Sequence, residues 1–148
     1  MLKVLIAEDE LMIADILEET LITNGYEVCG IARTVDEAVA LATLHKPDLA
    51  VLDVRLAQGD RGPEIARRLN GRGTLGILYA TGEDVRHSAL TRTDGSASIT
   101  KPYQVEDIPL ALAIVREIMT LGTATPPFPP GFRLLPELVP LSVHATSA

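Results

Sequence analysis

The stretch KVLIAEDE, residues 3–10, places an uninterrupted apolar run directly before three carboxylates. A short, continuous apolar run is typical of a strand that is covered on both faces, as in a parallel sheet. From Ile13 the period changes, because apolar residues recur at helical spacing as far as Leu21, and Asn24-Gly25 then supplies a helix stop. The start of the chain therefore predicts a buried strand, an acidic turn and an amphipathic helix.

The same alternation of strand and helix continues to Gly122. Further strands are predicted at 27–32, 48–53, 75–81 and 96–100. Helices are predicted behind a capping box formed by Thr34 and Glu37, from Pro63 onward, over 83–92 as a short polar helix, and over 105–119. This alternation predicts an α/β fold, a doubly wound five-stranded parallel sheet with helices on both faces.

The last part of the chain has a different composition. Residues 123–148 hold six of the ten prolines, so we divide the chain into a domain, 1–122, and a Pro-rich tail, 123–148. We do not expect a regular sixth strand–helix unit there. The tail does carry both phenylalanines, Phe128 and Phe132, which favours packing on its own domain or on a second subunit. A disordered tail is the alternative.

Composition and charge exclude several classes of function. The chain has 148 residues, 47% of them hydrophobic, which is typical of one globular domain with a sizeable core. Its net charge of −7 argues against nucleic-acid binding, because phosphate backbones need a Lys/Arg surface. No stretch reaches the ~18 apolar residues of a membrane span, and no signal-peptide pattern opens the chain. We therefore expect a cytoplasmic protein that binds neither nucleic acid nor a membrane.

Polar residues stand at the carboxyl ends of the predicted strands, where open α/β sheets bind their ligands. Glu8 and Asp9 follow the first strand, Asp53 ends the third, Thr81 the fourth, and Lys101 follows the fifth. Three carboxylates so close together repel one another, and a hard divalent cation removes that conflict. The pattern predicts a Mg²⁺ site. The third acid of the stretch falls at a helix start, where a solvated capping role is expected.

Together these motifs resemble the response-regulator receiver domain, the CheY-like fold of two-component signalling. The matching motifs are VLIAEDE, KPDLAVLDV, YATG and ITKPY, which follow one another at suitable spacing. Each motif is weak alone, but the set is specific, and the resemblance covers residues 1–121. It implies the flavodoxin-like strand order 2-1-3-4-5.

The resemblance also implies a phosphoacceptor site. Asp53 would accept a phosphoryl group from a sensor histidine kinase or a phosphotransfer protein. Glu8, Asp9 and Asp53, with the backbone carbonyl of Arg55, would hold the Mg²⁺ cofactor. Phosphoryl transfer needs in-line positioning and neutralisation of spread charge more than covalent help from the protein, which agrees with this donor set.

Two more strand ends complete the implied site, and one position departs from the family pattern. Thr81 would hydrogen-bond the phosphoryl group, and Lys101 would pair with it. Pro102 would follow Lys101 in a peptide bond that is often cis in this family. The aromatic that normally stands three residues before the lysine is replaced by Ser98. Gly82 beside Thr81 frees the loop, so a backbone rearrangement is a candidate substitute for the usual side-chain switch.

The motif YATG, residues 79–82, resembles a subclass of stand-alone receivers with an F/Y-A-T-G motif. Members of that subclass often occur beside histidine kinases of the HWE type, which makes such a kinase the expected partner. We expect a single-domain response regulator, not an enzyme beyond its own phosphorylation and dephosphorylation. It would signal by binding a downstream protein, and a homodimer is a further expectation. The alternative is a pseudo-receiver, an interaction module without phosphoryl turnover.

Overall fold

The computed structural model of the chain describes residues 1–69, 74–82 and 89–137. Its elements follow one another in the predicted alternation. They are β1 (Lys3–Ala7), α1 (Leu11–Thr23), β2 (Glu27–Ala32), α2 (Val35–His45), β3 (Leu49–Asp53), a 3₁₀ turn (Ala57–Gly59), α3 (Gly62–Arg68), β4 (Gly76–Thr81), β5 (Ala97–Thr100), α5 (Asp107–Leu121) and β6 (Phe132–Leu134).

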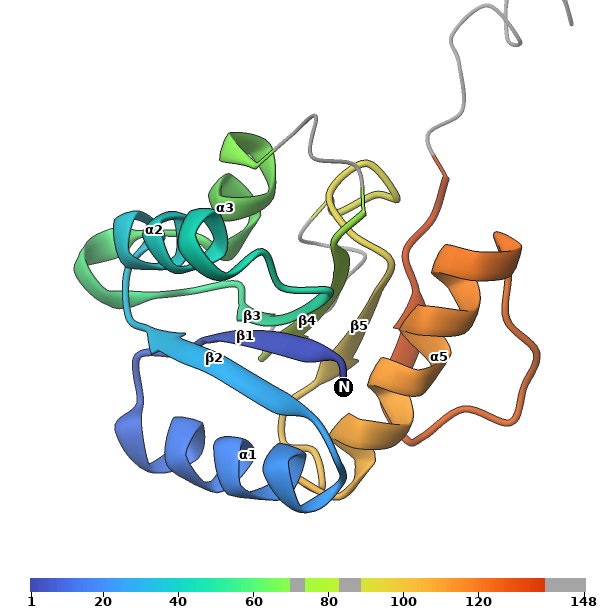
Figure 1. Ribbon diagram of the computed structural model, residues 1–148. Coiled ribbons are helices and arrows are strands. Elements are labelled where there is room, and N and C mark those ends of the chain that lie inside the picture. Colours follow the sequence, from blue (N-terminus) through green and yellow to red (C-terminus); the bar gives the residue numbers. More distant parts are fainter. Residues whose placement is uncertain (70–73, 83–88, 138–148) are drawn as a thin grey trace, which may run out of the picture.

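The strands form one sheet in the order β2-β1-β3-β4-β5-β6. The first five run parallel, and helices cover both faces, with α1 and α5 on one side and α2 and α3 on the other (Figure 1). The α/β class and the order 2-1-3-4-5 are thus confirmed. None of the helices in the described ranges is long and apolar enough to cross a bilayer.

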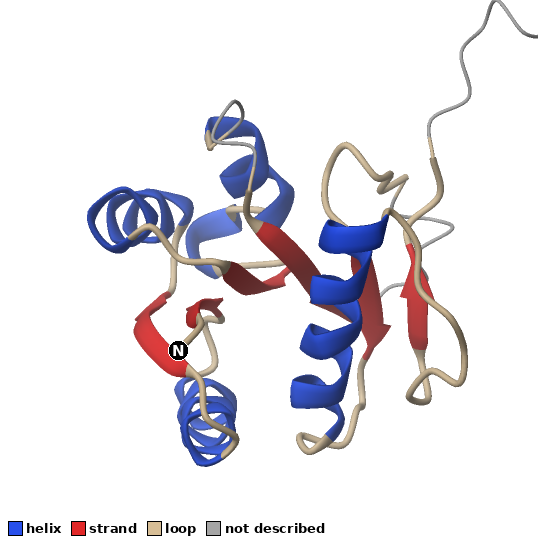
Figure 2. Cartoon of the chain, turned by 45° about the vertical axis from the view of Figure 1, so that its right-hand side comes forward, coloured by secondary structure: helices blue, strands red, loops and turns tan. Residues whose placement is uncertain are grey.

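The strand count was wrong by one. Within the segment assigned to the Pro-rich tail, β6 pairs antiparallel with β5 and becomes the outer strand of the sheet (Figure 2). Phe132 and Leu134 lie beside Ile99 and Ala97. Phe132, Ile99 and Ala97 belong to the core cluster under α5, and the half-buried Leu134 packs against it. The apolar alternation Phe-Arg-Leu therefore forms a strand despite the prolines on both sides of it. This part of the tail packs on its own domain.

The core consists of two layers, one on each face of the sheet, as the alternation of side chains along β1 requires. Val4 and Ile6 contribute to the layer under α1 and α5, whereas Leu5 and Ala7 contribute to the layer under α2 and α3. These four residues are 0–1% exposed. A continuous apolar run is therefore needed because both sides of the strand are covered.

Local signals place the helix ends close to where the sequence puts them. The Thr34 hydroxyl accepts a hydrogen bond from the Glu37 backbone N–H at 3.2 Å, which caps α2 as predicted. Gly122 ends α5 with φ +80°, a conformation that glycine adopts without a Cβ penalty. Of the helix predicted over 83–92, residues 83–88 lie outside the described residues, and none of 89–92 is helical, so the prediction is wrong for that part.

Candidate functional site

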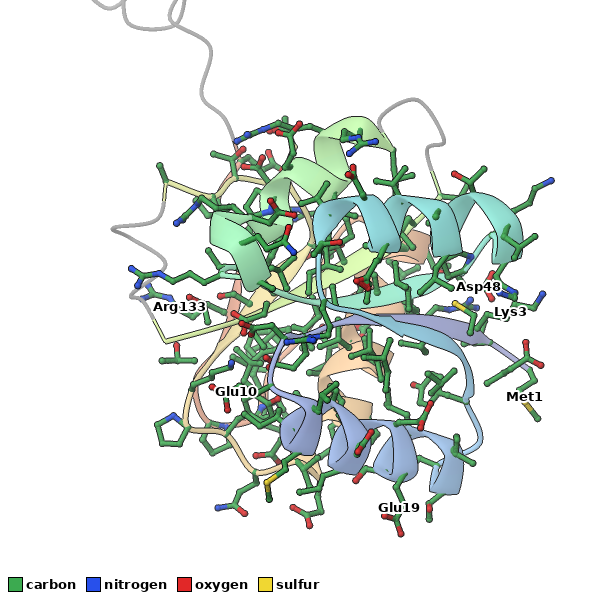
Figure 3. The ribbon with its side chains drawn as sticks, turned by 90° about the vertical axis from the view of Figure 1, so that its left-hand side faces the viewer. Met1, Lys3, Glu10, Glu19, Asp48 and Arg133 are labelled. Carbon is green, nitrogen blue, oxygen red and sulfur yellow. The ribbon has the colours of Figure 1, made fainter. Side chains whose placement is uncertain are left out.

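The carboxyl ends of the central strands bring the predicted site residues to one edge of the sheet. Strands β1 and β3 are parallel neighbours, with Ala7 opposite Leu52, so the residues that follow Ala7 lie near Asp53. Figure 3 shows Glu10 at this end of the molecule and the Lys3–Asp48 pair at the opposite end. The topology alone therefore gathers acids that are 45 residues apart in sequence, at Glu8 and Asp53.

Three carboxylates form a compact cluster there. Glu8, Asp9 and Asp53 each present an oxygen, and these oxygens lie within 4.8 Å of one another. Glu8 and Asp53 are 3% and 8% exposed. A hollow of about 480 Å³ opens over Asp9 and Asp53 and is also lined by Arg55, Thr81, Gly82, Lys101 and Glu10. An all-oxygen donor set that opens to solvent suits Mg²⁺, which keeps several waters and binds few carboxylates.

The Lys101 ammonium lies between two of these acids. Its Nζ donates to Asp53 Oδ2 at 2.9 Å and to Glu8 Oε1 at 3.2 Å. The backbone N–H of Lys101 donates to the Thr81 carbonyl at 2.8 Å, which fixes the start of the loop after β5. The Lys101–Pro102 peptide bond is cis, as the family resemblance led us to expect.

Burial and neighbouring charges shift the pKa values of Glu8 and Lys101. Burial is the main reason that the pKa of Glu8 rises to about 7, and the charge of Asp53 adds to the effect. The Glu10 backbone N–H and the Lys101 ammonium act in the opposite direction. Burial on its own would lower the pKa of Lys101, but the hydrogen bond and charge of Asp53, together with Glu8, raise it. Without a metal, the site therefore holds a firmly charged ammonium beside a carboxyl that protonates near neutral pH.

Backbone amides orient two of the carboxylates. The Arg55 N–H donates to Asp53 Oδ1 at 3.2 Å, and the Glu10 N–H donates to Glu8 Oε2 at 3.1 Å. Glu10 is the N-cap residue of α1, but its own side chain makes no capping hydrogen bond. The capping role expected for Glu10 is therefore wrong in detail, because Glu8 accepts the hydrogen bond at this turn.

The remaining predicted residues fall into two groups. Thr81 is buried at the end of β4, and both Thr81 and Gly82 line the hollow. Ser98 lies apart from it, inside β5, fully buried and with no hydrogen-bond partner for its hydroxyl among the described residues. Its neighbour on β4 is Tyr79, whose hydroxyl donates to the Asp94 carbonyl at 2.7 Å. An aromatic residue thus stands beside Ser98, on the adjacent strand.

Two glycines near the site were missed by the sequence analysis. A Cβ on Gly62, at the start of α3, would collide with the Asp53 carbonyl oxygen, so only glycine permits this approach of α3 to β3. Gly131 accepts a hydrogen bond through its carbonyl from the Thr100 N–H at 3.1 Å, next to Lys101. The Pro-Pro-Gly turn and the alternation Phe-Arg-Leu after it were a usable signal for Gly131. A lone glycine before a proline gave no comparable signal for Gly62.

Comparison with known proteins agrees with this geometry. The chain is 38% identical over 125 residues to "Transcriptional regulatory protein PdtaR" of Mycobacterium tuberculosis, covering 80% of this chain and 60% of that protein. The solution structure of the Erythrobacter litoralis PhyR response regulator REC domain matches with a TM-score of 0.72 at 26% identity, covering 84% of this chain and 96% of that one.

A signal receiver domain of a modulated diguanylate cyclase from Desulfovibrio desulfuricans G20 matches with a TM-score of 0.71 at 28% identity, covering 82% of this chain and 98% of that one. The chain thus spans whole receiver domains but only 60% of the curated relative PdtaR. The family model described as response regulator receiver domain matches residues 4–113. The chain belongs to the response regulator receiver domain family.

Proposed function

We propose that Asp53 accepts a phosphoryl group from a phosphohistidine of a sensor histidine kinase or a phosphotransfer protein. The observation that carries this proposal is the Lys101 ammonium, 2.9 Å from Asp53 Oδ2, in a hollow that opens beside a cluster of three acids. An isolated structural ion pair would need neither the additional acids nor an opening above them. Asp53 combines access for a donor with a fixed positive charge beside it.

The chemistry needs little from the protein beyond position and charge. A carboxylate oxygen of Asp53 attacks phosphorus, the bond from phosphorus to the donor imidazole nitrogen breaks, and the imidazole keeps that electron pair. Lys101 balances the charge that spreads over the phosphoryl oxygens, and the Arg55 N–H holds the Asp53 carboxylate in place. Thr81 lines the hollow at the end of β4, and its hydroxyl would bind the phosphoryl group after transfer.

The three acids, together with the backbone carbonyl of Arg55, would hold Mg²⁺. When bound, the ion supplies positive charge to the phosphoryl oxygens during transfer. In dephosphorylation, a water oxygen would attack phosphorus, the phosphorus–oxygen bond to Asp53 would break, and inorganic phosphate would leave the regenerated carboxylate. The chain's own chemistry would be limited to this phosphorylation and dephosphorylation, and its output would be binding to a downstream protein.

An apolar groove beside the site is the surface that we propose for the phosphodonor. The groove has a volume of about 440 Å³ and is lined by Ile13, Ile16, Lys101, Pro102, Tyr103 and Val105. Lys101 lines both this groove and the acidic hollow, so a partner seated in the groove would lie next to the hollow that contains Asp53. The exposed Leu11 and Met12 extend the apolar surface on α1. The motif YATG makes kinases of the HWE type our first choice of donor.

Two isoleucines on α1 test the groove with a matched pair of variants. Ile16 and Ile22 are 51% and 55% exposed, and of these two only Ile16 lines the groove. Ile16→Glu should slow transfer from a phosphorylated kinase and leave phosphorylation by acetyl phosphate unchanged, because the small donor needs no docking surface. Ile22→Glu should leave both rates unchanged. Equal rates of kinase transfer in the two variants would exclude this groove as the docking surface.

The phosphoacceptor proposal is tested by intact-protein mass spectrometry after incubation with acetyl phosphate. With Mg²⁺ we expect the mass of one phosphoryl group to be added, and with EDTA we expect none. Absence of the adduct with Mg²⁺, both with acetyl phosphate and with a panel of phosphorylated kinases, would contradict the proposal. It would favour the pseudo-receiver alternative, to which the small residue Ser98 already lends some support.

A further inference from the structure

The C-terminal segment 129–136 runs along the outer edge of β5 (Figure 2). Besides the β6–β5 pairing, backbone hydrogen bonds hold it at both ends. Leu135 N–H donates to the Ser96 carbonyl at 3.1 Å, and the Pro136 carbonyl accepts from Arg92 N–H at 2.9 Å. At its other end, the Gly131 carbonyl accepts from Thr100 N–H at 3.1 Å. The segment therefore reaches the last residue of β5, which directly precedes Lys101.

The backbone that carries the Lys101 side chain is consequently held from both sides. On the inner side, Lys101 N–H donates to the Thr81 carbonyl at 2.8 Å, and on the outer side the hydrogen bond from Thr100 to Gly131 ties the preceding residue to the C-terminal segment. A cavity of about 420 Å³ lies between the 100–104 loop and Pro130–Gly131, and Lys101 is part of its lining. On this side of the loop, the hydrogen bond from Thr100 to Gly131 therefore holds the residue that directly precedes Lys101.

The Gly131 turn is itself firmly anchored. Gly131 has φ +76°, and the Phe132 N–H donates back to the Pro129 carbonyl at 3.1 Å. Phe132 is 7% exposed, and its ring lies 5.1 Å from that of Phe128, measured between centroids. A Cβ on Gly131 would stand 3.4 Å from both the N and O atoms of Thr100. The turn therefore combines a conformation that favours glycine with close contact to the β5 backbone.

We propose that the Gly131 turn positions Lys101 for the reaction at Asp53. The proposal rests on the proposed phosphoacceptor function, and Gly131 acts through Thr100 without touching the reacting atoms. The turn fixes where the β5 backbone ends and hence where the ammonium stands relative to the Asp53 carboxylate. A segment that only closed the edge of the sheet would contribute to stability and leave the reaction rate unchanged.

Two glycines offer a matched test of this role. Gly131 and Gly122 have φ +76° and +80°, but a Cβ on Gly122 would meet nothing within 4 Å, and Gly122 caps α5 away from the site. Replacement by alanine strains the backbone in the same way at both positions. Asparagine tolerates this conformation better than alanine, so Gly131→Asn serves as the rescue variant.

The measurements are made on the full chain, at saturating Mg²⁺, for wild type, Gly131→Ala, Gly122→Ala and Gly131→Asn. We expect Gly131→Ala to reduce the rate of phosphorylation by acetyl phosphate about tenfold, part of the ~10²–10³-fold that loss of a preorganised donor costs. Gly122→Ala should keep the wild-type rate of phosphorylation, although we expect its melting temperature to be similar to that of Gly131→Ala. Gly131→Asn should recover much of the loss.

A second readout follows the Lys101 side chain by its Cε–Hε cross-peak in a ¹³C NMR spectrum. We expect this peak to move in Gly131→Ala and to stay in place in Gly122→Ala. An unmoved peak in Gly131→Ala, or an unchanged rate despite a moved peak, would overturn the positioning role. If wild type takes up no phosphoryl group, the proposed function fails, while the Lys101 peak still decides whether the turn positions this side chain.

Discussion

Strand β3 has an aspartate at each end, and the two lie in opposite environments. Asp48, just before the strand, is exposed and accepts a hydrogen bond from the Lys3 backbone N–H at 2.9 Å (Figure 3). Asp53, at the end of the strand, is 8% exposed and pairs with the Lys101 ammonium. Both ends of the sheet thus combine an acid with a nearby lysine residue. What distinguishes the site is burial together with a cluster of further acids.

This comparison shows why residue type alone does not make a reactive carboxylate. In water an aspartate and a lysine attract weakly, because the solvent screens their charges. At the acidic hollow, the carboxylates of Glu8 and Asp53 and the Lys101 ammonium are partly removed from solvent, so their charges interact more strongly. The pKa of Glu8 rises there to about 7. The carboxylates at this edge of the sheet therefore repel one another, and a bound cation would reduce that repulsion.

The largest effect is expected from replacing the two aspartates in turn. Asp53→Asn should abolish phosphorylation by acetyl phosphate, because the amide has no nucleophilic carboxylate oxygen. Asp48→Asn should retain the wild-type rate. Intact mass and the rate of adduct formation measure both. A phosphoryl group still found on the Asp53→Asn protein would place the acceptor elsewhere and remove the contrast between the two strand ends.

The two lysines give the next largest effect. Lys101→Met should slow phosphorylation by about 100-fold, since it removes a preorganised positive charge from the reacting group. Lys3→Met, at the opposite end of the sheet, should change the rate by less than about twofold, because charges farther away than about a Debye length are screened. The comparison is made by initial rates at saturating Mg²⁺. Similar rates for both lysine variants would contradict the role given to Lys101.

We expect Mg²⁺ binding to depend on pH, because Glu8 is one of the proposed ligands. Its carboxyl has a pKa of about 7, raised mainly by burial, so below that pH a proton must leave before Mg²⁺ binds. The apparent Mg²⁺ affinity should therefore fall by up to about tenfold per pH unit below pH 7 and level off above it. Isothermal titration at pH 6 and pH 8 measures this, and Glu8→Gln should flatten the profile. Equal affinity at both values would show that Glu8 does not take part.

The smallest effect is expected on the stability of the protein when Asp48, at the exposed end of β3, is replaced. Asp48→Asn weakens the hydrogen bond to the Lys3 N–H, and we expect a loss of about 0.5–1 kcal/mol in the free energy of unfolding. Urea unfolding followed by circular dichroism measures this change. A loss several times larger would mean that the exposed end is also a strongly organised site, against the distinction drawn between the two ends.

Much of this fold could be predicted because its signals are local. The apolar run of β1, the capping box at Thr34 and the glycine after α5 each act within a few residues. The site followed as well, since parallel strands deliver their carboxyl ends to one edge and thereby bring Glu8, Asp9 and Asp53 together. Position along the strands was enough to predict that these acids meet.

Nonlocal packing could not be predicted in the same way. Pairing of β6 with β5 requires an unpaired edge of β5, a turn at Gly131 and burial of Phe132 in the core. The many prolines nearby indicated an irregular tail, so this pairing was not predicted. The close approach of Gly62 to Asp53 depends on how α3 enters the sheet. Residue type and spacing carry no information about such distances. The positions of the acids could therefore be predicted from the sequence, whereas the backbone contacts at Gly62 and Gly131 could not.

If Asp53 is a phosphoacceptor supported by Lys101 and Mg²⁺, as we propose, the protein should bind beryllofluoride at this residue. This anion mimics an aspartyl phosphate, so amide NMR spectra are recorded with Mg²⁺ and beryllofluoride on wild type and Asp53→Ala. We expect shifts around Asp53, Thr81 and Lys101 in wild type and none in the variant. A wild-type spectrum that stays unchanged at saturating Mg²⁺ would exclude Asp53 as the phosphoacceptor.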